Sequence, residues 1–199
     1  MARYDSLASR YDRRWAAYNA RSLALLDPYL RGGAGDLLDL ACGTANLLPR
    51  LVDRARSYLG TDVSREMLRA ARPKLAAASI PAAVAAADVS RLPFPAAAFD
   101  TVVCASALHD LPDPAAALAE VRRVLRSGGR LLLLDWSRER LTMRALNLWL
   151  RVSGDPFRRM YTTAEAGALL CDAGFHVAHR ERRAVSRLWE LWVIEATSA

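Results

Sequence analysis

Residues that commonly bind metals or form redox pairs are scarce in this 199-residue chain. It has only three cysteines, Cys42, Cys104 and Cys171, and none of them is spaced like a metal-ligand or redox pair. No group of three metal ligands is visible in the sequence either. The cysteines are interpreted as small core residues, and we expect a protein of the reducing cytoplasm that uses no metal.

Long hydrophobic runs are also missing. A membrane-spanning helix needs about 20 consecutive apolar residues, whereas the longest run here, Leu131–Leu134 with its neighbours, has the length of a strand. Residues 1–10 contain nothing like the apolar segment of a signal peptide. We therefore expect neither a signal peptide nor stable insertion into a membrane.

Lysine is nearly absent, although the chain is basic. The formal net charge is +7, and Lys74 is the only lysine among 28 basic residues. Such an excess of arginine in an alanine-rich chain is typical of genome composition rather than of selection for a polyanion. The arginines are scattered in small groups, so a solvated surface is the favoured interpretation and nucleic-acid binding is not expected.

Hydrophobic residues make up 53% of the chain, enough for the core of one globular domain. Residues 1–199 are therefore treated as one domain, in which residues 1–34 form an N-terminal helical cap. Expected strands alternate with expected helices, which indicates a mainly parallel α/β sheet with helices on both faces. The expected strands are Leu37–Leu40, Tyr58–Thr61, Ala83–Ala87, Phe99–Cys104, Arg130–Trp136, Phe175–Arg180 and Leu188–Glu195.

Helices are expected where apolar residues recur at helical spacing. Ser64 is the predicted N-cap of one helix, and Asp113 followed by Pro opens another, which Ser127–Gly129 stops. Pro28 and Pro73 are predicted to end or kink the helices in which they lie. The expected helices are residues 5–30, Asn46–Arg56, the segment after Ser64, the segment from Pro114, Arg140–Val152 and Thr163–Ala173.

A carboxylate and several small residues follow the first expected strand. In the stretch LLDLACGTANL, Asp39 ends the strand, and Ala41, Gly43 and Ala45 let the chain bend tightly. Ligands of parallel sheets bind at the carboxyl ends of strands, so Asp39 stands where a ligand is expected. A dinucleotide site would need the pattern G-x-G-x-x-G, which the bend lacks. A ligand with an ammonium group and an adenosine tail, such as S-adenosylmethionine (SAM), fits this arrangement better.

Five stretches resemble, in order, the motifs of class I SAM-dependent methyltransferases of small molecules, including the ubiquinone and menaquinone type. They are LLDLACGTANLLPRL, YLGTDVSREML, ADVSRLPFPAAAFDTVVCASALHDLPD, ALAEVRRVLRSGGRLLLLDW and YTTAEAGALLCDAGFHV. The resemblance implies a Rossmann-like seven-stranded sheet whose last strand is antiparallel. It also implies SAM as the cofactor, S-adenosylhomocysteine as the product, and a small-molecule acceptor.

The resemblance further implies which residues bind SAM. Asp62 would accept hydrogen bonds from both ribose hydroxyls, although a helix-flanking cap is the alternative. Asp88 would accept from the adenine amine while the backbone of Val89 meets the ring, although Asp88 could be an ordinary turn residue. The other expected cofactor-binding residues, besides Asp39, Ala41 and Gly43, are Thr44, Val63, Met67 against the adenine face, the carbonyl of Ala105, and Tyr11, which would close over SAM. Core packing is the alternative for Met67 and Tyr11, and a purely structural role for Ala105.

Two positions depart from the family pattern. Ala41 and Ala45 stand where glycine is usual. If either backbone needs a positive φ, alanine costs about 1 kcal/mol there. Binding of SAM is still expected, because alanine is small.

One histidine is a candidate for catalysis. His109 follows the fourth strand in the stretch ALHDLPD, beside the expected transfer site, where a histidine could act as a general base. The alternative is a loop histidine without a catalytic role. Methyl transfer depends mainly on holding donor and acceptor together, so a base is required only when the acceptor must lose a proton.

Residues 137–162 include a segment where related enzymes insert a substrate lid. Its sequence LTMRALNLWLRVSGDPFRRMYTT mixes apolar and basic residues. Three interpretations remain open: a pocket for a hydrophobic or aromatic metabolite, a helix resting on an anionic membrane near a lipid or quinone substrate, and a packed amphipathic helix with solvated arginines.

Three function classes follow from these observations. The favoured class is a methyltransferase that acts on a small molecule, expected to be a hydrophobic or aromatic metabolite. The second is a SAM-binding protein without transferase activity, which the two alanines leave open. The third, an NAD-type oxidoreductase, is disfavoured by the spacing of the bend. The sequence does not predict the oligomeric state.

Overall fold

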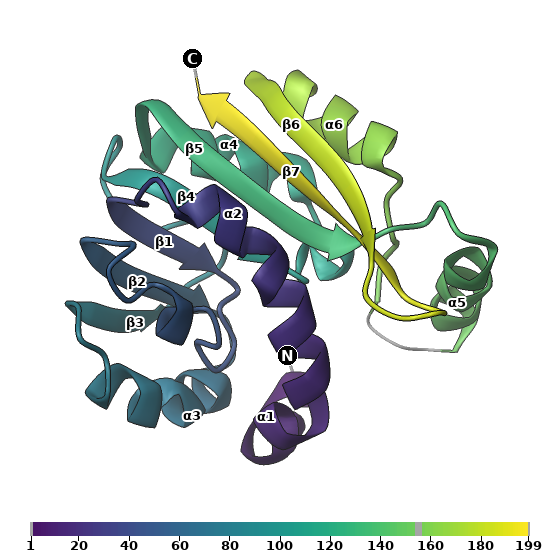
Figure 1. Ribbon diagram of the computed structural model, residues 1–199, viewed down its shortest axis with the longest axis horizontal. Helices are drawn as coiled ribbons and strands as arrows, with labels where there is room; N and C mark the ends of the chain where they lie inside the picture. The colour runs from purple at the N-terminus through teal and green to yellow at the C-terminus, as the bar shows by residue number, and fades with distance from the viewer. Residues whose placement is uncertain (1, 154–156, 199) are drawn as a thin grey trace.

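The computed structural model describes residues 2–153 and 157–198, and its centre is a seven-stranded sheet (Figure 1). The strand order is β3-β2-β1-β4-β5-β7-β6. β7 is antiparallel to both of its neighbours, and the remaining pairs are parallel. This topology confirms the predicted fold. The strands are β1 (Asp36–Leu40), β2 (Ser57–Asp62), β3 (Ala82–Ala86), β4 (Phe99–Ala105), β5 (Leu125–Trp136), β6 (Phe175–Ala184) and β7 (Glu190–Ser198).

Helices cover both faces of the sheet, as Figure 1 shows. The ends of α1 and α2 pack with α3 on one face, and α4 and α6 pack on the other. α5 stands apart, beyond the carboxyl end of β5 (Figure 1). The helices are α1 (Ala2–Leu23), α2 (Asp27–Leu30), α3 (Arg65–Ala76), α4 (Pro114–Val124), α5 (Leu141–Val152) and α6 (Thr163–Asp172), with short 3-10 turns η1 (Ala24–Leu26), η2 (Leu48–Arg50) and η3 (Leu108–Asp110).

Alternation of side chains along the central strands divides the core into two layers. On β5, Leu131 and Leu133 pack toward α4 and α6, whereas Leu132 and Leu134 pack toward α1, α2 and α3. Successive side chains of a strand point to opposite faces, so a strand covered on both sides has to be apolar throughout. The run of leucines in this strand is explained by that requirement.

Two helix starts agree with their predicted caps. The side chain of Ser64 accepts a hydrogen bond from the backbone N–H of Met67 at the start of α3. That of Asp113 accepts one from the backbone N–H of Ala116 at the start of α4, where Pro114 occupies the first turn. Both caps satisfy donors that have no partner within the helix.

Other local predictions were wrong. Asn46–Arg56 does not form the expected helix: only η2 is helical there, and Asp53 at φ 59° turns the chain into the left-handed region. α4 ends at Val124, before Ser127–Gly129, because the backbone becomes extended from Leu125 onward. Pro28 does not end a helix but lies in the first turn of α2. Pro73 lies inside α3, which ends three residues later, close to the predicted end.

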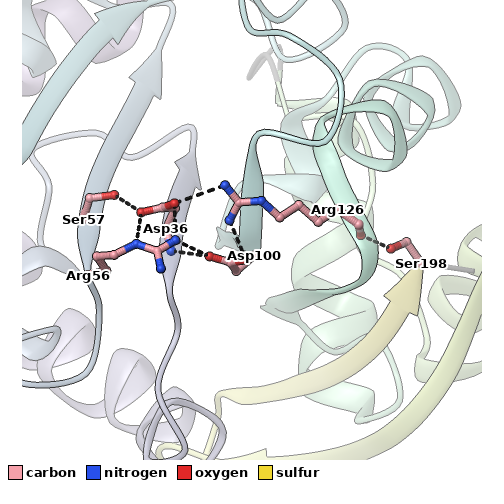
Figure 2. A network of polar contacts seen from close by, with 6 residues as sticks. All are labelled: Asp36, Arg56, Ser57, Asp100, Arg126 and Ser198. Atoms are coloured by element: carbon pink, nitrogen blue, oxygen red, sulfur yellow. Dashed lines mark hydrogen bonds and ion pairs between the residues drawn. The ribbon is translucent and has the colours of Figure 1, made fainter.

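Ion pairs connect the amino ends of the strands (Figure 2). The carboxylate of Asp36 accepts from Arg56 Nε at 2.8 Å and pairs with Arg126 at 3.2 Å. Asp100 pairs with the same two arginines, at 3.0 Å and 2.5 Å. The hydrogen bond from Arg56 holds the pKa of Asp36 well below its usual range. This network, here called the amino-edge network, lies at the opposite edge from the strand ends where ligands are expected.

Candidate functional site

A cavity of about 320 Å³ lies at the carboxyl edge of the sheet, between the strand ends and α1. Residues from four strand ends contribute to it, and so does one face of α1. Such a crevice at the carboxyl ends of parallel strands is where ligands bind in sheets of this kind. The predicted residues among its lining are Tyr11, Asp39, Ala41, Gly43, Asp62, Val63, Met67, Asp88, Val89 and Ala105.

Asp39 contributes a buried carboxylate to the cavity. Its side chain is only 3% exposed, and it accepts a hydrogen bond from the Tyr58 hydroxyl at 2.9 Å. Burial raises the pKa of Asp39 to about 7, and the negative charge of Asp62 adds to the effect. A cationic group bound nearby would favour the charged form of this carboxylate.

The bend after β1 is built from three residues in the left-handed region. Ala41, Gly43 and Ala45 have φ values of 53°, 55° and 58°. The expected cost of the two alanines applied only if their backbone had a positive φ, and both residues have one. Each alanine therefore carries a conformational cost of about 1 kcal/mol that glycine would avoid.

Asp62 ties the bend to the start of α3. Its two carboxylate oxygens accept from the backbone N–H groups of Gly43 at 2.9 Å and Ser64 at 2.8 Å. Burial raises the pKa of Asp62 despite these hydrogen bonds. Each oxygen keeps a second lone pair for a ligand. The functional and the structural interpretation of this residue therefore apply together.

Asp88 closes the cavity next to β3. Its Oδ1 accepts from the backbone N–H and the hydroxyl of Ser90, at 2.9 Å and 2.7 Å. These two bonds lower the pKa of Asp88, the side-chain bond having the larger effect. Both predicted interpretations are compatible with this geometry, because the turn engages one oxygen and leaves the other for a ligand.

Apolar residues form the rest of the predicted binding surface. Met67 and Val89 are 2% and 9% exposed, and both also pack against other residues of the interior. Val63 is 49% exposed, although it follows a buried strand. An exposed valine beside the cavity is free to contact a ring that enters it.

One face of α1 forms the opposite wall. Tyr4, Tyr11 and Ser22 line the cavity and lie nearly above one another on the helix, because their spacings of seven and eleven residues are close to whole turns. Burial, with the nearby charge of Asp62 adding to it, raises the pKa of Tyr11 to about 12. The hydroxyl of Tyr11 is therefore neutral at physiological pH.

Polar contacts fasten α1 over the site. The carboxylate of Asp12 accepts from Lys74 at 2.5 Å, from the Thr44 hydroxyl at 2.5 Å and from Asn46 at 2.9 Å. Thr44 is 1% exposed and is absent from the cavity lining, so its side chain holds the helix rather than facing the cavity. Nearer the end of α1, the Tyr18 hydroxyl shares hydrogen bonds with Ser106 and with Trp136 Nε1, each at 2.8 Å.

His109 lies beside the cavity but does not line it. The ring is 4% exposed, its Nδ1 is 2.6 Å from Oδ1 of Asp135, and it stacks on Trp136 with ring centroids 4.2 Å apart. The backbone carbonyl of His109 accepts from the N–H groups of Arg158 and Arg159. This enclosure favours the structural interpretation, and the role as a base stays a prediction.

Several lining residues escaped the sequence reasoning. Tyr4 and Ser22 repeat at the helical period of Tyr11, which is a signal that could have found them. Ser106 follows β4 with φ 56°, and its backbone N–H donates to the carbonyl of Leu134. No sequence pattern marks such a residue in advance, because its role depends on how α1 folds back over the strand.

A family profile described as "Methyltransferase domain" matches residues 38–133, the segment that holds β1 to β5 and the cavity-lining strand ends. Curated relatives agree: ubiquinone/menaquinone biosynthesis C-methyltransferase UbiE of Bordetella parapertussis is 35% identical over 150 residues, and that of Syntrophotalea carbinolica is 36% identical over 148. Over this segment the chain is similar to class I SAM-dependent methyltransferases of small molecules. The matches cover 68% and 67% of this chain, but only 55% and 60% of the relatives' own length.

Solved structures share this fold. A chain from the complex of the Haloferax volcanii Trm112 methyltransferase activator with a methyltransferase aligns at a TM-score of 0.83 and 21% identity, covering 98% of this chain and 97% of that one. Magnesium protoporphyrin IX methyltransferase from Synechocystis, solved with bound S-adenosylhomocysteine, aligns at 0.71 and 20% identity, covering 92% and 84%. At these identities the likeness concerns the fold alone.

Across residues 2–153 and 157–198, no helix combines the length and the apolar character needed to cross a bilayer.

Proposed function

We propose that this protein transfers a methyl group from SAM to a small-molecule acceptor, expected to be a hydrophobic or aromatic metabolite. The observation that carries the proposal is the placement of three carboxylates, Asp39, Asp62 and Asp88, at the ends of three adjacent strands around one cavity. The similarity to methyltransferases supports the same activity.

The three carboxylates match the polar groups of SAM in type and order. Asp39 at the end of β1 would balance the ammonium group, directly or through water. Asp62 at the end of β2 would accept from the ribose hydroxyls with the lone pairs that the backbone N–H groups leave. Asp88 would accept from the adenine amine, with Val63, Met67 and Val89 beside the ring.

The chain's own part in the reaction is mainly positioning. Bound SAM would supply an activated methyl group. α1 covers the cavity, and the contacts of Asp12 and Tyr18 keep it there, which would exclude water from the reacting groups. The carbonyl of Ala105 would meet the ammonium group. Proximity of this kind explains why a strong catalytic group is not needed.

The proposed cap and lid follow from the same arrangement. Residues 1–34 would act as a cap, since α1 forms one wall of the cavity. Residues 137–162 would act as a substrate lid, although residues 154–156 of this range lie outside the described residues. A cytoplasmic location is inferred from the three cysteines, all of which are free.

A second acceptor class has specific support. The curated relatives are named for ubiquinone and menaquinone biosynthesis, so a lipid or quinone acceptor at a membrane surface is the leading alternative to a water-soluble metabolite. A SAM-binding protein without transferase activity is the other alternative.

Calorimetry tests the cofactor. SAM and S-adenosylhomocysteine should bind and NAD should not. Asp62→Asn should weaken SAM at least about tenfold, because a charged acceptor of the ribose is lost. Asp53→Asn, an exposed aspartate outside the cavity lining, is the matched control and should bind like the wild type. Equal affinities for the two variants would overturn the assignment of Asp62.

Turnover tests the reaction itself. Methyl-labelled SAM and a metabolite extract, incubated with the protein, should yield S-adenosylhomocysteine and a labelled product whose structure identifies the acceptor. A lipid extract in a parallel arm separates the two acceptor classes. Tight SAM binding without label transfer in either arm would support the binding protein instead.

A further inference from the structure

α5 presents apolar side chains on two opposite faces. The inner face holds Met143 and Leu150, which pack with Phe157 and Met160 into a small core of their own. The outer face is open to solvent. Its side chains lie at spacings of seven, eight and eleven residues, which place them on one side of the helix. The exposed fractions are 78% for Leu141, 64% for Leu148, 61% for Trp149 and 74% for Val152.

The hairpin between β6 and β7 extends this face. Leu188 at its tip is 64% exposed. Its carbonyl accepts a hydrogen bond from the Thr142 hydroxyl at 3.0 Å, which fixes the tip against the start of α5. The name outer patch is used below for the five exposed side chains Leu141, Leu148, Trp149, Val152 and Leu188. An amphipathic helix normally exposes polar residues, so an apolar outer face indicates a partner.

Arginines surround the outer patch. Arg144 and Arg151 are exposed on one flank of α5, and Arg187 is exposed beside Leu188. Arg140, at the start of the helix, reaches the carbonyls of the hairpin tip. Residues 140–153 and 186–188 contain no aspartate or glutamate. The partner of this surface should therefore combine an apolar interior with negative charge at its border.

We propose that the outer patch docks on a membrane surface that contains anionic lipids. A helix in this role buries its apolar face at the level of the headgroups and pairs its arginines with lipid phosphates, and tryptophan is favoured at that depth. A second copy of the chain fits less well, because a symmetric contact would bring the arginines of both copies together without acids to balance them.

The placement of α5 gives the docking a consequence for the cavity. α5 stands beyond the carboxyl end of β5, at the same edge of the sheet as the strand ends that line the cavity (Figure 1). Docking through the outer patch would hold that edge near the lipid. This inference does not depend on methyl transfer, because it rests on the patch alone.

Vesicle flotation tests the docking. The full chain should float with vesicles of equal parts phosphatidylcholine and phosphatidylglycerol, and at least about tenfold less with phosphatidylcholine alone or at high salt. Leu148→Glu and Trp149→Glu should each reduce partitioning at least about tenfold, because each places a charge on the apolar face. The control is Val52→Glu, which puts the same charge at a 47% exposed valine outside the patch and should float like the wild type.

Further measurements make the result decisive. Circular dichroism and SAM calorimetry without vesicles should be unchanged in the patch variants, which separates docking from folding and from the proposed function. Tryptophan emission should shift to the blue on anionic vesicles, and Trp149→Phe should abolish most of that shift. The proposal is overturned if the wild type fails to float, if patch variants float equally well, or if ultracentrifugation shows a dimer that Leu148→Glu dissociates.

Discussion

Replacing Asp39 with asparagine should make the protein more stable at neutral pH in the absence of ligand. The wild-type carboxylate is buried, with one hydrogen bond from Tyr58, and its pKa is raised from 3.8 to about 7. Asparagine keeps an oxygen that can accept the Tyr58 hydrogen bond, and it has nearly the same volume. The substitution removes the charge and introduces an amide NH2 group, whose own effect does not change with pH and therefore leaves the pH dependence intact.

The magnitude follows from the pKa difference. In the unfolded chain Asp39 ionises near its ordinary pKa, whereas the folded protein retains the proton until the pH approaches 7. The free energy of unfolding is therefore highest below the unfolded pKa, falls as the pH rises, and levels off above about 7. The full loss is about 4 kcal/mol, of which about 2.5 kcal/mol falls between pH 5 and pH 8.

Urea denaturation at a series of pH values measures this effect. The quantity to follow is the free energy of unfolding of Asp39→Asn minus that of the wild type, because other titrating groups largely cancel in the difference. It should grow by about 2.5 kcal/mol from pH 5 to pH 8. A difference that stays constant over this range would refute the raised pKa of Asp39.

Asp36→Asn is the matched control. Its carboxylate belongs to the amino-edge network, and the hydrogen bond from Arg56 lowers its pKa. A lowered pKa stabilises the fold above the unfolded pKa, near 3.8, and this stabilisation is lost only on acidification. The Asp36→Asn difference should therefore be destabilising and flat from pH 5 to pH 8, in contrast to that of Asp39→Asn.

Five further substitutions, at three places in the fold, have defined outcomes. Ala41→Gly or Ala45→Gly should raise the free energy of unfolding by about 0.5–1 kcal/mol, and at least one of them should tighten SAM binding. Gly43→Ala should lower the free energy of unfolding by about 1 kcal/mol. If both glycine variants bind SAM much more weakly, the bend is built differently. His109→Gln should cost about 2 kcal/mol of stability and leave SAM affinity intact, because the ring is enclosed; a stable variant with turnover about a hundredfold lower would establish the base instead. Gly35→Ala should destabilise the protein by at least about 2 kcal/mol in thermal unfolding. The added Cβ would overlap with the Asp100 carboxylate of the amino-edge network, and the backbone there has a φ of +57°. An unchanged melting temperature would show that this edge adapts.

The sequence allowed the sheet and most of the cavity to be predicted, because both depend on short-range patterns. Asp39, Asp62 and Asp88 each follow a recognisable strand, and parallel strands bring their carboxyl ends together at one edge. The helix predicted for Asn46–Arg56 was wrong. The leucines there have helical spacing, but they pack around a turn in which Asp53 adopts the left-handed conformation.

The contacts of α1 and His109 could not be predicted from the sequence, for a different reason. The bonds of Asp12 to Lys74 and Thr44 join residues far apart in the chain, and no local pattern encodes such a pairing. The position of His109 in the sequence placed it correctly beside the site. Its enclosure depends on Asp135 and on a segment after α5, so only the folded chain reveals it.

The indole of Trp136 connects two coverings of the site. Its Nε1 donates to the Tyr18 hydroxyl on α1, and its ring stacks on His109, whose carbonyl holds the segment after α5. A displacement of α1 large enough to release a ligand would break the first contact and free the indole edge that lies next to the second. Under the proposed function, movements of α1 and of the segment after α5 are therefore expected to be coupled through Trp136.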